Sequence, residues 1–462
     1  MTKSPTPLPQ PTRSFWQDED GAITILALSF LLITLVIGGL SVDFNRVMAD
    51  RTRLQIAADT AAHAALYSRD DKSADEARQV ASDIILDLLP TSGFGSDVIT
   101  SADVSFGVWD PEKFEFTAAQ DSKSAVRVYA AMAEVRNNAS RNLLLHILGF
   151  DTFDVGVQSV FSTYYPPCLT EGFVADNVVD IQSNNRFSAP FCVHANNYVS
   201  LNQNNVFEAG TGVSMPDISK LDMPNSGYEK NSGLEAALRQ GVYRMRLLAD
   251  LPEIIDSFWT ANAKHLPPYV APGSLYEVDE RKLAVEPAKS GSGGPPAKSG
   301  GGGLTPNHFM PGAVNYLACG GSGKITLGEG TYSEFVFITS CEVKFASGTI
   351  LEDVVIATTN TASDSFNSPS GLTLGRDDAC AAGGGAVLMT LGGFRAAAKL
   401  NVFGGQILAL GDIKFAANAN GIQGASFISG GNIDGTSNMR FGSCNQAGME
   451  HVYRAQYFKM VQ

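Results

Sequence analysis

The hydrophobic pattern of the chain begins with one uncharged run that extends from Gly21 to Val42. Within it, residues 22–42 read AITILALSFLLITLVIGGLSV. Helical residues rise about 1.5 Å each, so this run spans roughly 33 Å, enough for the ~30 Å hydrocarbon core of a bilayer. We therefore predict a transmembrane helix over residues 22–42, preceded by a tail over residues 1–21.

A retained anchor is favoured over the alternative, a cleavable signal peptide. The apolar run is longer than the apolar region of a signal peptide, and no small-residue cleavage pattern closes it. The sequence SVDFNR follows directly instead.

The helical pattern continues over residues 43–68. Apolar positions recur at helical spacing and form one stripe, while charged residues occupy the other faces. Six of the nine positions from 57 to 65 are alanine, and small side chains let helices approach closely. Two uses of the stripe fit this pattern: packing on the chain's own domain, and a helix–helix oligomer. The stripe comprises Phe44, Val47, Leu54, Ala58, Ala61 and Ala65.

Helix and strand patterns then alternate as far as residue 165. An amphipathic helix is predicted over 72–89 and ends at Pro90. Three alternating strands, a short helix and a last strand follow. This order predicts an α+β sandwich, so that residues 43–165 form a helical stalk and a small α+β domain. The predicted strands are 103–110, 113–119, 124–135 and 151–165, and the short helix is 140–150.

From residue 166 onward, short apolar strands repeat between Gly, Asn and Ser turns. This rhythm is typical of a parallel β-helix, which we predict for 166–462, with a β-sandwich as the alternative. Residues 216–310 interrupt the rhythm with helical segments and a Gly/Pro/Ser-rich tract over 287–303. We expect this tract to be a loop on one edge of the β-domain, and the alternative is a linker between domains.

Composition narrows the function classes. The net charge of −14 argues against a nucleic-acid partner, because phosphate binding needs a basic face. Only 17% of residues are charged and 46 are glycine, which fits a β architecture with many tight turns.

All six cysteines lie beyond the apolar run, and their even number indicates an oxidising compartment. No two of them have the close spacing of a zinc site, so we expect structural disulfides and no metal. Six cysteines can pair in many ways, and pairing between sequence neighbours is the simplest. We therefore place the N-terminus in the cytoplasm and the bulk outside the inner membrane. The neighbouring pairs are Cys168 with Cys192, Cys319 with Cys341, and Cys380 with Cys444.

Candidate catalytic residues are few. Asp377 and Asp378 form a tight acidic pair, and two carboxylates can hydrolyse glycosides when they are held at the right separation. Adjacent residues of a strand point to opposite faces, however, and such pairs are usually solvated turns. No nucleophile-elbow or phosphate-loop motif occurs. We therefore predict no enzyme activity and no cofactor.

The segment from Asp20 to Leu66 resembles the N-terminal module of TadG-type proteins, the TadE/TadG-like family of Flp pilus assembly. The resemblance rests on Asp20-Gly21, Val42-Asp43, Arg53-Leu54-Gln55, Ala58-Asp59, Ala61-Ala62 and Ala64-Ala65. It implies an inner-membrane component of a tight-adherence pilus or related secretion apparatus. The family or assembly positions that it marks are Gly21, Asp43, Leu54, Gln55, Asp59, Ala61 and Ala65.

Two departures from the family limit what the resemblance implies. Pilin-like relatives carry Glu five residues after the processing glycine, whereas this chain has Leu26, so prepilin-peptidase cleavage at Gly21 is not expected. Some TadG-type proteins also carry a D-x-S-x-S metal site, and the stretch from Asp180 to Ser183 does not match that spacing.

We therefore predict a membrane-anchored structural or assembly component of a Tad pilus. Its expected partners are inner-membrane lipid and other pilus proteins. A surface adhesin that binds glycan through the β-domain is the alternative, and a polysaccharide-processing enzyme is a more distant one.

Overall fold

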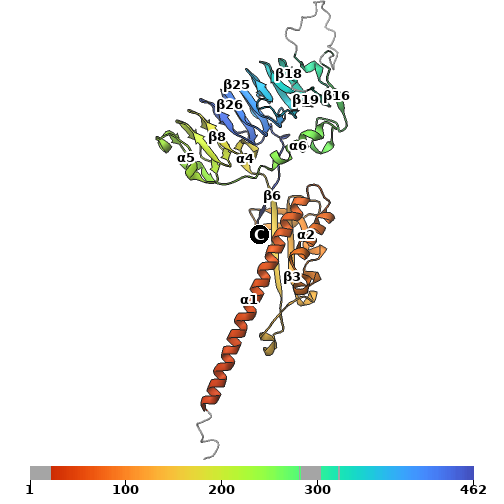
Figure 1. Cartoon of the computed structure of the whole chain (residues 1–462), viewed down its shortest axis with the longest axis vertical. Coiled ribbons are helices and arrows are strands. Elements are labelled where there is room, and N and C mark those ends of the chain that lie inside the picture. Colours follow the sequence, from red (N-terminus) through yellow and green to blue (C-terminus); the bar gives the residue numbers. More distant parts are fainter. Residues whose placement is uncertain (1–21, 280, 282–302, 321–322) are drawn as a thin grey trace, which may run out of the picture. The chain divides into compact units, whose positions relative to one another are not determined.

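The computed structural model describes residues 22–279, 281, 303–320 and 323–462, and the chain divides into two compact units (Figure 1). The first unit runs to Tyr164 and includes Gln456–Gln462, and the second is Tyr165–Ala455. The Gly/Pro/Ser-rich tract predicted over 287–303 lies outside the described residues except for Gly303.

The first unit begins with one continuous helix, α1 (Ala22–Ser68). The predicted membrane span and the predicted stalk are therefore two halves of the same helix. Helix α2 (Ala74–Leu88) packs against α1. It begins at Ser73, whose side chain accepts from the Glu76 N–H while Glu76 accepts from the Ser73 N–H, and this capping box satisfies two groups at the helix terminus.

A five-stranded antiparallel sheet with the order β2-β1-β3-β6-β29 completes the first unit. Strands β1 and β2 form the predicted hairpin. The last strand was not predicted: it pairs with β6, with Tyr457 opposite Tyr164. The predicted boundary of 166–462 is therefore wrong at its end, because the second unit is inserted between two paired strands of the first. The bounds are β1 Val104–Asp110, β2 Glu115–Ala118, β3 Ala125–Met132, β6 Val155–Tyr164 and β29 Tyr457–Met460.

The short helix predicted over 140–150 is mostly absent. Strand β4 (Ser140–Arg141) pairs with β5 (Thr152–Phe153), and only the 3₁₀ turn η6 (Leu145–Leu148) is helical between them. The remaining short elements of this unit are α3 Thr91–Phe94, η3 Ser96–Val98, η4 Ser101–Asp103 and η5 Glu134–Arg136.

The second unit is built from short strands in parallel register. Gly172 of β7 pairs with Cys192 of β10, which pairs with Gly212 of β13, in steps of 20 residues (172, 192, 212). Every strand pairing in the described part of this unit is parallel, unlike the antiparallel pairing of a β-sandwich. The first strands are β7 Gly172–Ala175, β8 Val178–Ile181, β9 Arg186–Phe187, β10 Cys192–Ala195, β11 Tyr198–Leu201, β12 Asn205–Phe207 and β13 Gly212–Met215, preceded by α4 Pro167–Thr170.

The predicted insertion 216–310 contains strands as well as the predicted helical part. Strands β14 (Asn231–Ser232) and β15 (Leu238–Gln240) lie at one end of the parallel stack, and β16 (Leu275–Glu277) lies at the other. Helix α6 (Arg246–Phe258) lies between them in sequence and packs on β19, β24 and β25. Strand pairing therefore continues into this segment, which corrects the prediction that it interrupts the strand rhythm. Its other short elements are η7 Ile218–Lys220, η8 Gly227–Lys230, α5 Leu234–Ala237 and η9 Ala263–His265.

The remaining strands lead back to the start of the unit. Strand β26 pairs with β7, β27 with β8 and β28 with β9, so the last turn of the chain stacks directly on the first. The sequence rhythm predicted most of these strands but missed β17, β22 and β27. Their bounds, after η10 Pro306–His308, are β17 Val314–Leu317, β18 Lys324–Leu327, β19 Gly330–Thr339, β20 Glu342–Phe345, β21 Thr349–Thr358, β22 Phe366–Ser368, β23 Leu372–Leu374, β24 Ala386–Thr390, β25 Phe394–Ala409, β26 Ile413–Ser429, β27 Ile433–Gly435 and β28 Arg440–Gly442.

Two apolar cores hold this stack together. Alternate residues of β19 serve both: Phe335 and Phe337 enter the interior of the stack, whereas Val336 and Ile338 pack under α6. Rings stack between successive turns in the interior, as Phe187 does with Phe441 across the junction of the first and last turns. Burial on both faces explains why these strands read as near-continuous apolar runs.

Candidate functional site

The first half of α1 exposes apolar side chains on almost every face. Its large side chains are between 42% (Val36) and 77% (Ile23) exposed, so the described part of the chain covers almost none of them. Within the described residues, this is the one helix long and apolar enough to cross a membrane. A surface of this size and composition indicates a contact with lipid or with another protein.

The second half of α1 is docked on the sheet. Leu54, Ala61 and Ala65 are fully buried against β3 and β6, so the alanine stripe packs on the chain's own domain. This favours packing on the chain's own domain over the alternative, a helix–helix oligomer. The predicted stripe is wrong at Phe44, which is 59% exposed, because the neighbouring Asp43 is the buried residue of that turn.

Two other marked residues form a polar contact on the same half. Gln55 donates to Asp59 Oδ1 (2.7 Å) and to the carbonyl oxygen of Gln158 on β6 (3.2 Å). The side-chain amide of Gln55 thus links α1 to β6 beside the apolar interface, and both of its N–H donors are used.

Asp43 occupies the junction between the two halves and is completely buried. Its carboxylate accepts from the backbone N–H of Leu143 (2.7 Å), Leu144 (3.0 Å) and Leu145 (2.7 Å). These N–H groups lie at the start of η6 and have no acceptor within that turn, so the Asp43 carboxylate forms charge-assisted hydrogen bonds with them. One helical turn earlier, a Cβ on Gly39 would lie 3.1 Å from Leu144 Cβ, so glycine permits the close approach.

The structure thus assigns contacts to most of the predicted site residues. Leu54, Ala61 and Ala65 share one buried face, Gln55 and Asp59 form one contact, and Asp43 stands apart from both sets. Gly21 lies outside the described residues. The partner of Asp43, residues 143–145, was not predicted, because a backbone donor leaves no signature in side-chain chemistry.

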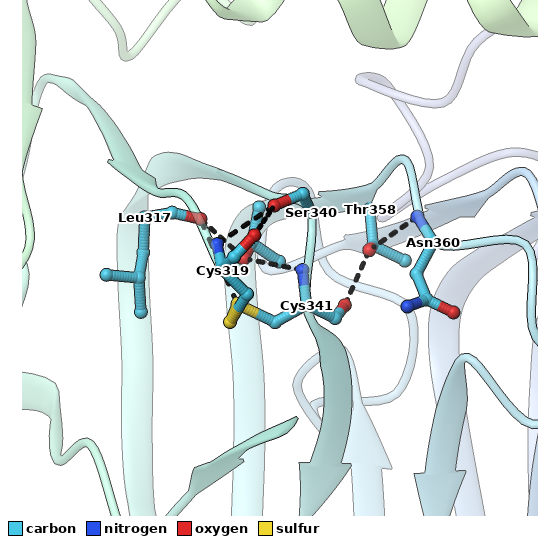
Figure 2. The surroundings of a disulfide bond; sticks show 7 residues. Leu317, Cys319, Ser340, Cys341, Thr358 and Asn360 are labelled. Atoms are coloured by element: carbon cyan, nitrogen blue, oxygen red, sulfur yellow. Dashed lines mark hydrogen bonds between the residues drawn. A yellow bond between two sulfur atoms is a disulfide. The ribbon is translucent and has the colours of Figure 1, made fainter. Parts of the chain in front are cut away.

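The three disulfides join sequence neighbours as predicted: Cys168–Cys192, Cys319–Cys341 and Cys380–Cys444. Around the second, hydroxyls bridge successive turns of the stack (Figure 2). Thr339 donates to the Leu317 carbonyl and accepts from the Cys341 N–H, and Thr358 donates to the Cys341 carbonyl (2.7 Å). The disulfide therefore reinforces a corner that hydrogen bonds already define.

Asp378 belongs to an ion pair. It lies 2.6 Å from Arg376 Nε and accepts from the Ala381 N–H. The hydrogen bond from the Arg376 guanidinium holds the pKa of Asp378 below its ordinary value. The general acid of glycoside hydrolysis needs a raised pKa, so this environment does not suit Asp378 to that role.

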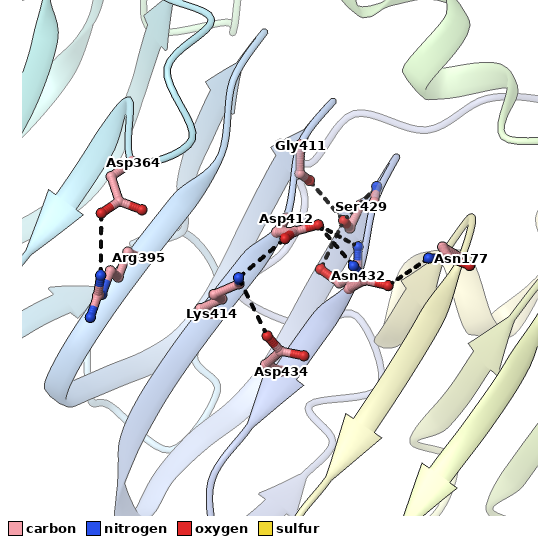
Figure 3. Close-up of polar contacts among 10 residues, drawn as sticks. Asn177, Asp364, Arg395, Gly411, Asp412, Lys414, Ser429, Asn432 and Asp434 are labelled. Atoms are coloured by element: carbon pink, nitrogen blue, oxygen red, sulfur yellow. Dashed lines mark hydrogen bonds and ion pairs between the residues drawn. The ribbon is translucent and has the colours of Figure 1, made fainter. Parts of the chain in front are cut away.

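A second set of charged residues lies on strands near the junction of the first and last turns (Figure 3). Lys414 contacts Asp412 (3.2 Å) and Asp434 (3.8 Å), and Arg395 contacts Asp364 (3.4 Å). Asp434 lies opposite Asp180 in the parallel register. Burial raises the pKa of both carboxyls, and the charge of Asp434 raises that of Asp180 further. No cluster that could hold a metal ion occurs among the described residues.

Two protein-family models match separate parts of the chain. Residues 172–445 match the family described as a domain of unknown function (DUF7867), which covers more than half of the chain. The chain belongs to this family. Residues 21–79 match the family described as putative Flp pilus-assembly TadE/G-like, so the N-terminal segment is TadG-like as predicted. No curated protein and no solved structure matches the chain.

Proposed function

We propose that this protein is a single-pass, membrane-anchored structural or assembly component of a Tad (Flp-type) pilus or a related secretion apparatus. The carrying observation is that the TadE/G-like match over 21–79 contains one helix with two environments. Its first half has no partner within the described chain, and its second half is docked by an alanine face. An uncovered apolar helix of this length fits a bilayer.

The rest of the chain belongs outside the inner membrane in this proposal. Its three disulfides suit an oxidising compartment, and they all lie in the second unit. The tail over residues 1–21 then remains in the cytoplasm. The pilus family match supports other pilus proteins as partners.

The second unit acts, in our proposal, as a rigid display body with the fold of a parallel β-helix. Parallel stacking in 20-residue steps supports this fold, because each turn then buries its neighbours' apolar face. We propose no catalytic role for it, since Asp378 is held by Arg376 and has a lowered pKa.

A deletion strain complemented with the full chain tests the pilus role. We expect the deletion to abolish surface pili, the full chain to restore them, and a chain without residues 22–42 to fail. Unchanged pili in the deletion strain would contradict the proposal. If the purified chain also bound a glycan array specifically, the adhesin alternative would replace it.

A further inference from the structure

The loop over residues 143–150 carries a second exposed apolar surface. Ile147 is 72% exposed and Phe150 is 61% exposed, and Leu143 and Leu148 are also at least half exposed. A small domain rarely leaves four large apolar side chains in one short loop facing water. This patch therefore requires an explanation apart from the core of the first unit.

The loop is held in a fixed position. Its ends are paired as β4 and β5, and Asn142 Nδ2 donates to the Phe150 carbonyl (2.8 Å). Ser140 Oγ donates to Asp50 Oδ2 on α1 (2.9 Å), and Asp43 accepts the three N–H bonds described above. The apolar side chains are therefore exposed on a loop whose backbone is held by hydrogen bonds at both ends and at Asp43.

These same contacts place the loop at the end of the apolar run. Asp43 directly follows Val42, and the Gly39–Leu144 contact lies within the last turn of residues 22–42. If that run spans a bilayer, the loop lies where the hydrocarbon core meets the headgroups. Arg46, three residues after Asp43, and Arg141, two residues before the loop, are both exposed, as basic residues are at membrane interfaces.

The backbone N–H groups of the loop are largely hydrogen-bonded within the protein, as contact with lipid requires. The N–H groups of residues 143–145 go to Asp43, that of Ile147 goes to the Leu144 carbonyl, and that of Phe150 goes to the Leu145 carbonyl. Backbone donors next to hydrocarbon must be bonded within the protein, because lipid tails cannot accept from them. A loop that only met water would have no such need.

We propose that the 143–150 loop is a membrane wedge, which inserts Leu143, Ile147, Leu148 and Phe150 into the lipid interface beside the anchor helix. The occupant is the bilayer itself, because the contacts of Gly39 and Asp43 hold the loop against the end of the uncovered half of α1, where Leu40 and Phe44 are also exposed. The inference rests on the proposed membrane anchoring. It adds a second lipid contact that fixes the rotation of the docked domain about the anchor.

Site-specific fluorescence of the full chain in phosphatidylcholine/phosphatidylglycerol vesicles tests the wedge. One cysteine per variant carries a fluorophore: Ile147→Cys in the loop, Ile33→Cys in the span, and Phe114→Cys as the matched control. All six native cysteines are in disulfides, and Phe114 is apolar and 76% exposed. It lies beyond the opposite end of the sheet, after β1, whose Gly107 pairs with Ala125.

Doxyl lipids, which quench from within the bilayer, should quench labels 33 and 147 several-fold more than label 114. Quenching at 33 but not at 147 would overturn the wedge and leave the anchor intact. Quenching at neither position would overturn the anchor and the wedge together. If label 147 were shielded from both doxyl lipid and aqueous iodide, and more so at higher protein density, a second copy would cover the loop and the lipid proposal would fail.

A substitution sharpens the test. With a label at Leu148→Cys, Ile147→Ser and Phe150→Ser together should reduce doxyl quenching to the level of label 114. Both side chains are exposed, so the loop should stay folded, and unchanged hydrogen exchange at the amides of 143–145 would show this. Quenching that persisted in the folded variant would contradict insertion by these side chains.

Discussion

The two halves of α1 share one backbone and differ in what covers them. Residues 23–42 expose apolar side chains on almost every face, whereas residues 54–66 bury a narrow stripe of leucine and alanine under the sheet. The first half therefore lacks a partner in the described chain, and the second half has one. A uniform helix would not need the change from leucine to alanine, which marks the change from an uncovered helix surface to one that the sheet covers.

The change begins at two contacts that lie one helical turn apart. Gly39 and Asp43 are buried in a stretch where nearly all neighbouring positions are exposed. Gly39 lets the loop approach, and Asp43 satisfies its backbone donors. This pair fixes the level at which the domain begins, so the length of the uncovered half is set by a specific contact as well as by composition.

Charges placed in the uncovered half should have the largest effect. Leu32→Arg, Ile33→Arg and Leu35→Arg together should release the chain from membranes, because each arginine at the centre of a span costs about 3 kcal/mol. The measurement is the fraction that resists alkaline carbonate extraction.

The matched control puts the same three charges on the exposed face of the docked half, as Thr52→Arg, Ile56→Arg and Thr60→Arg. This variant should stay membrane-bound. Equal release of the two variants would mean that the halves do not differ in lipid contact.

Removal of the junction carboxylate comes next. Asp43→Leu leaves three backbone donors without their acceptor, and an unsatisfied buried donor costs about 1–3 kcal/mol. Amide exchange at 143–145 should accelerate by about 100-fold or more, since about 1.4 kcal/mol is a factor of ten. Asp43→Asn keeps one acceptor oxygen and should accelerate exchange less. Unchanged exchange in Asp43→Leu would show that the contact does not hold the loop.

Overpacking of the docked face should have a moderate effect. Ala61 is fully buried, and Ala61→Leu should destabilise the helix–sheet interface by about 1–3 kcal/mol because the sheet cannot recede. Thr60→Leu on the neighbouring exposed position should change stability by less than about 0.5 kcal/mol. Hydrogen exchange of the amides of 57–65 measures both, and equal effects would argue against tight docking.

The smallest expected effect is a loss of stability of the first unit in acid. Burial raises the pKa of Asp103, but hydrogen bonds from Arg136 (2.9 Å) and Thr100 outweigh it and hold the pKa below its ordinary value of 3.8. The stabilisation is therefore present above pH 3.8 and is lost as the pH falls through the lowered pKa.

Urea unfolding of the domain between pH 5 and pH 2.5, compared with Arg136→Gln, measures this loss. The wild type should lose stability more steeply than the variant, while doxyl quenching at label 33 stays constant. A parallel loss in both proteins would exclude the Asp103–Arg136 pair as the cause.

The sequence predicts α1 well because both of its halves carry a strong pattern. An uncharged run and an alanine stripe each specify a helix and its surroundings, and the strands of the sheet follow from alternation. Residues 140–150 were mistaken for a helix, because their apolar run suggests a packed face. The structure exposes Ile147 and Phe150 instead, and the pattern cannot tell an exposed apolar side chain from a buried one.

The arrangement of the second unit was the least predictable part. Short strands in a regular rhythm indicate stacked turns, but rhythm does not say which turn stacks on which. The pairing of Phe427 with Phe173 joins the last turn to the first, and this long-range contact leaves no local signal. The strand at 457–460 was missed for the same reason, since its partner β6 lies nearly 300 residues away (164 to 457).

Spin labels placed in turn along α1 of the full chain in lipid vesicles test the central claim most directly. Over residues 23–42, the account predicts high collision rates with oxygen and low rates with an aqueous nickel chelate on every exposed face. Over residues 46–67, it predicts nickel accessibility that oscillates with the helical period of about 3.6 residues. High nickel accessibility throughout residues 23–42 would contradict a helix with one half in lipid and the other on its own sheet.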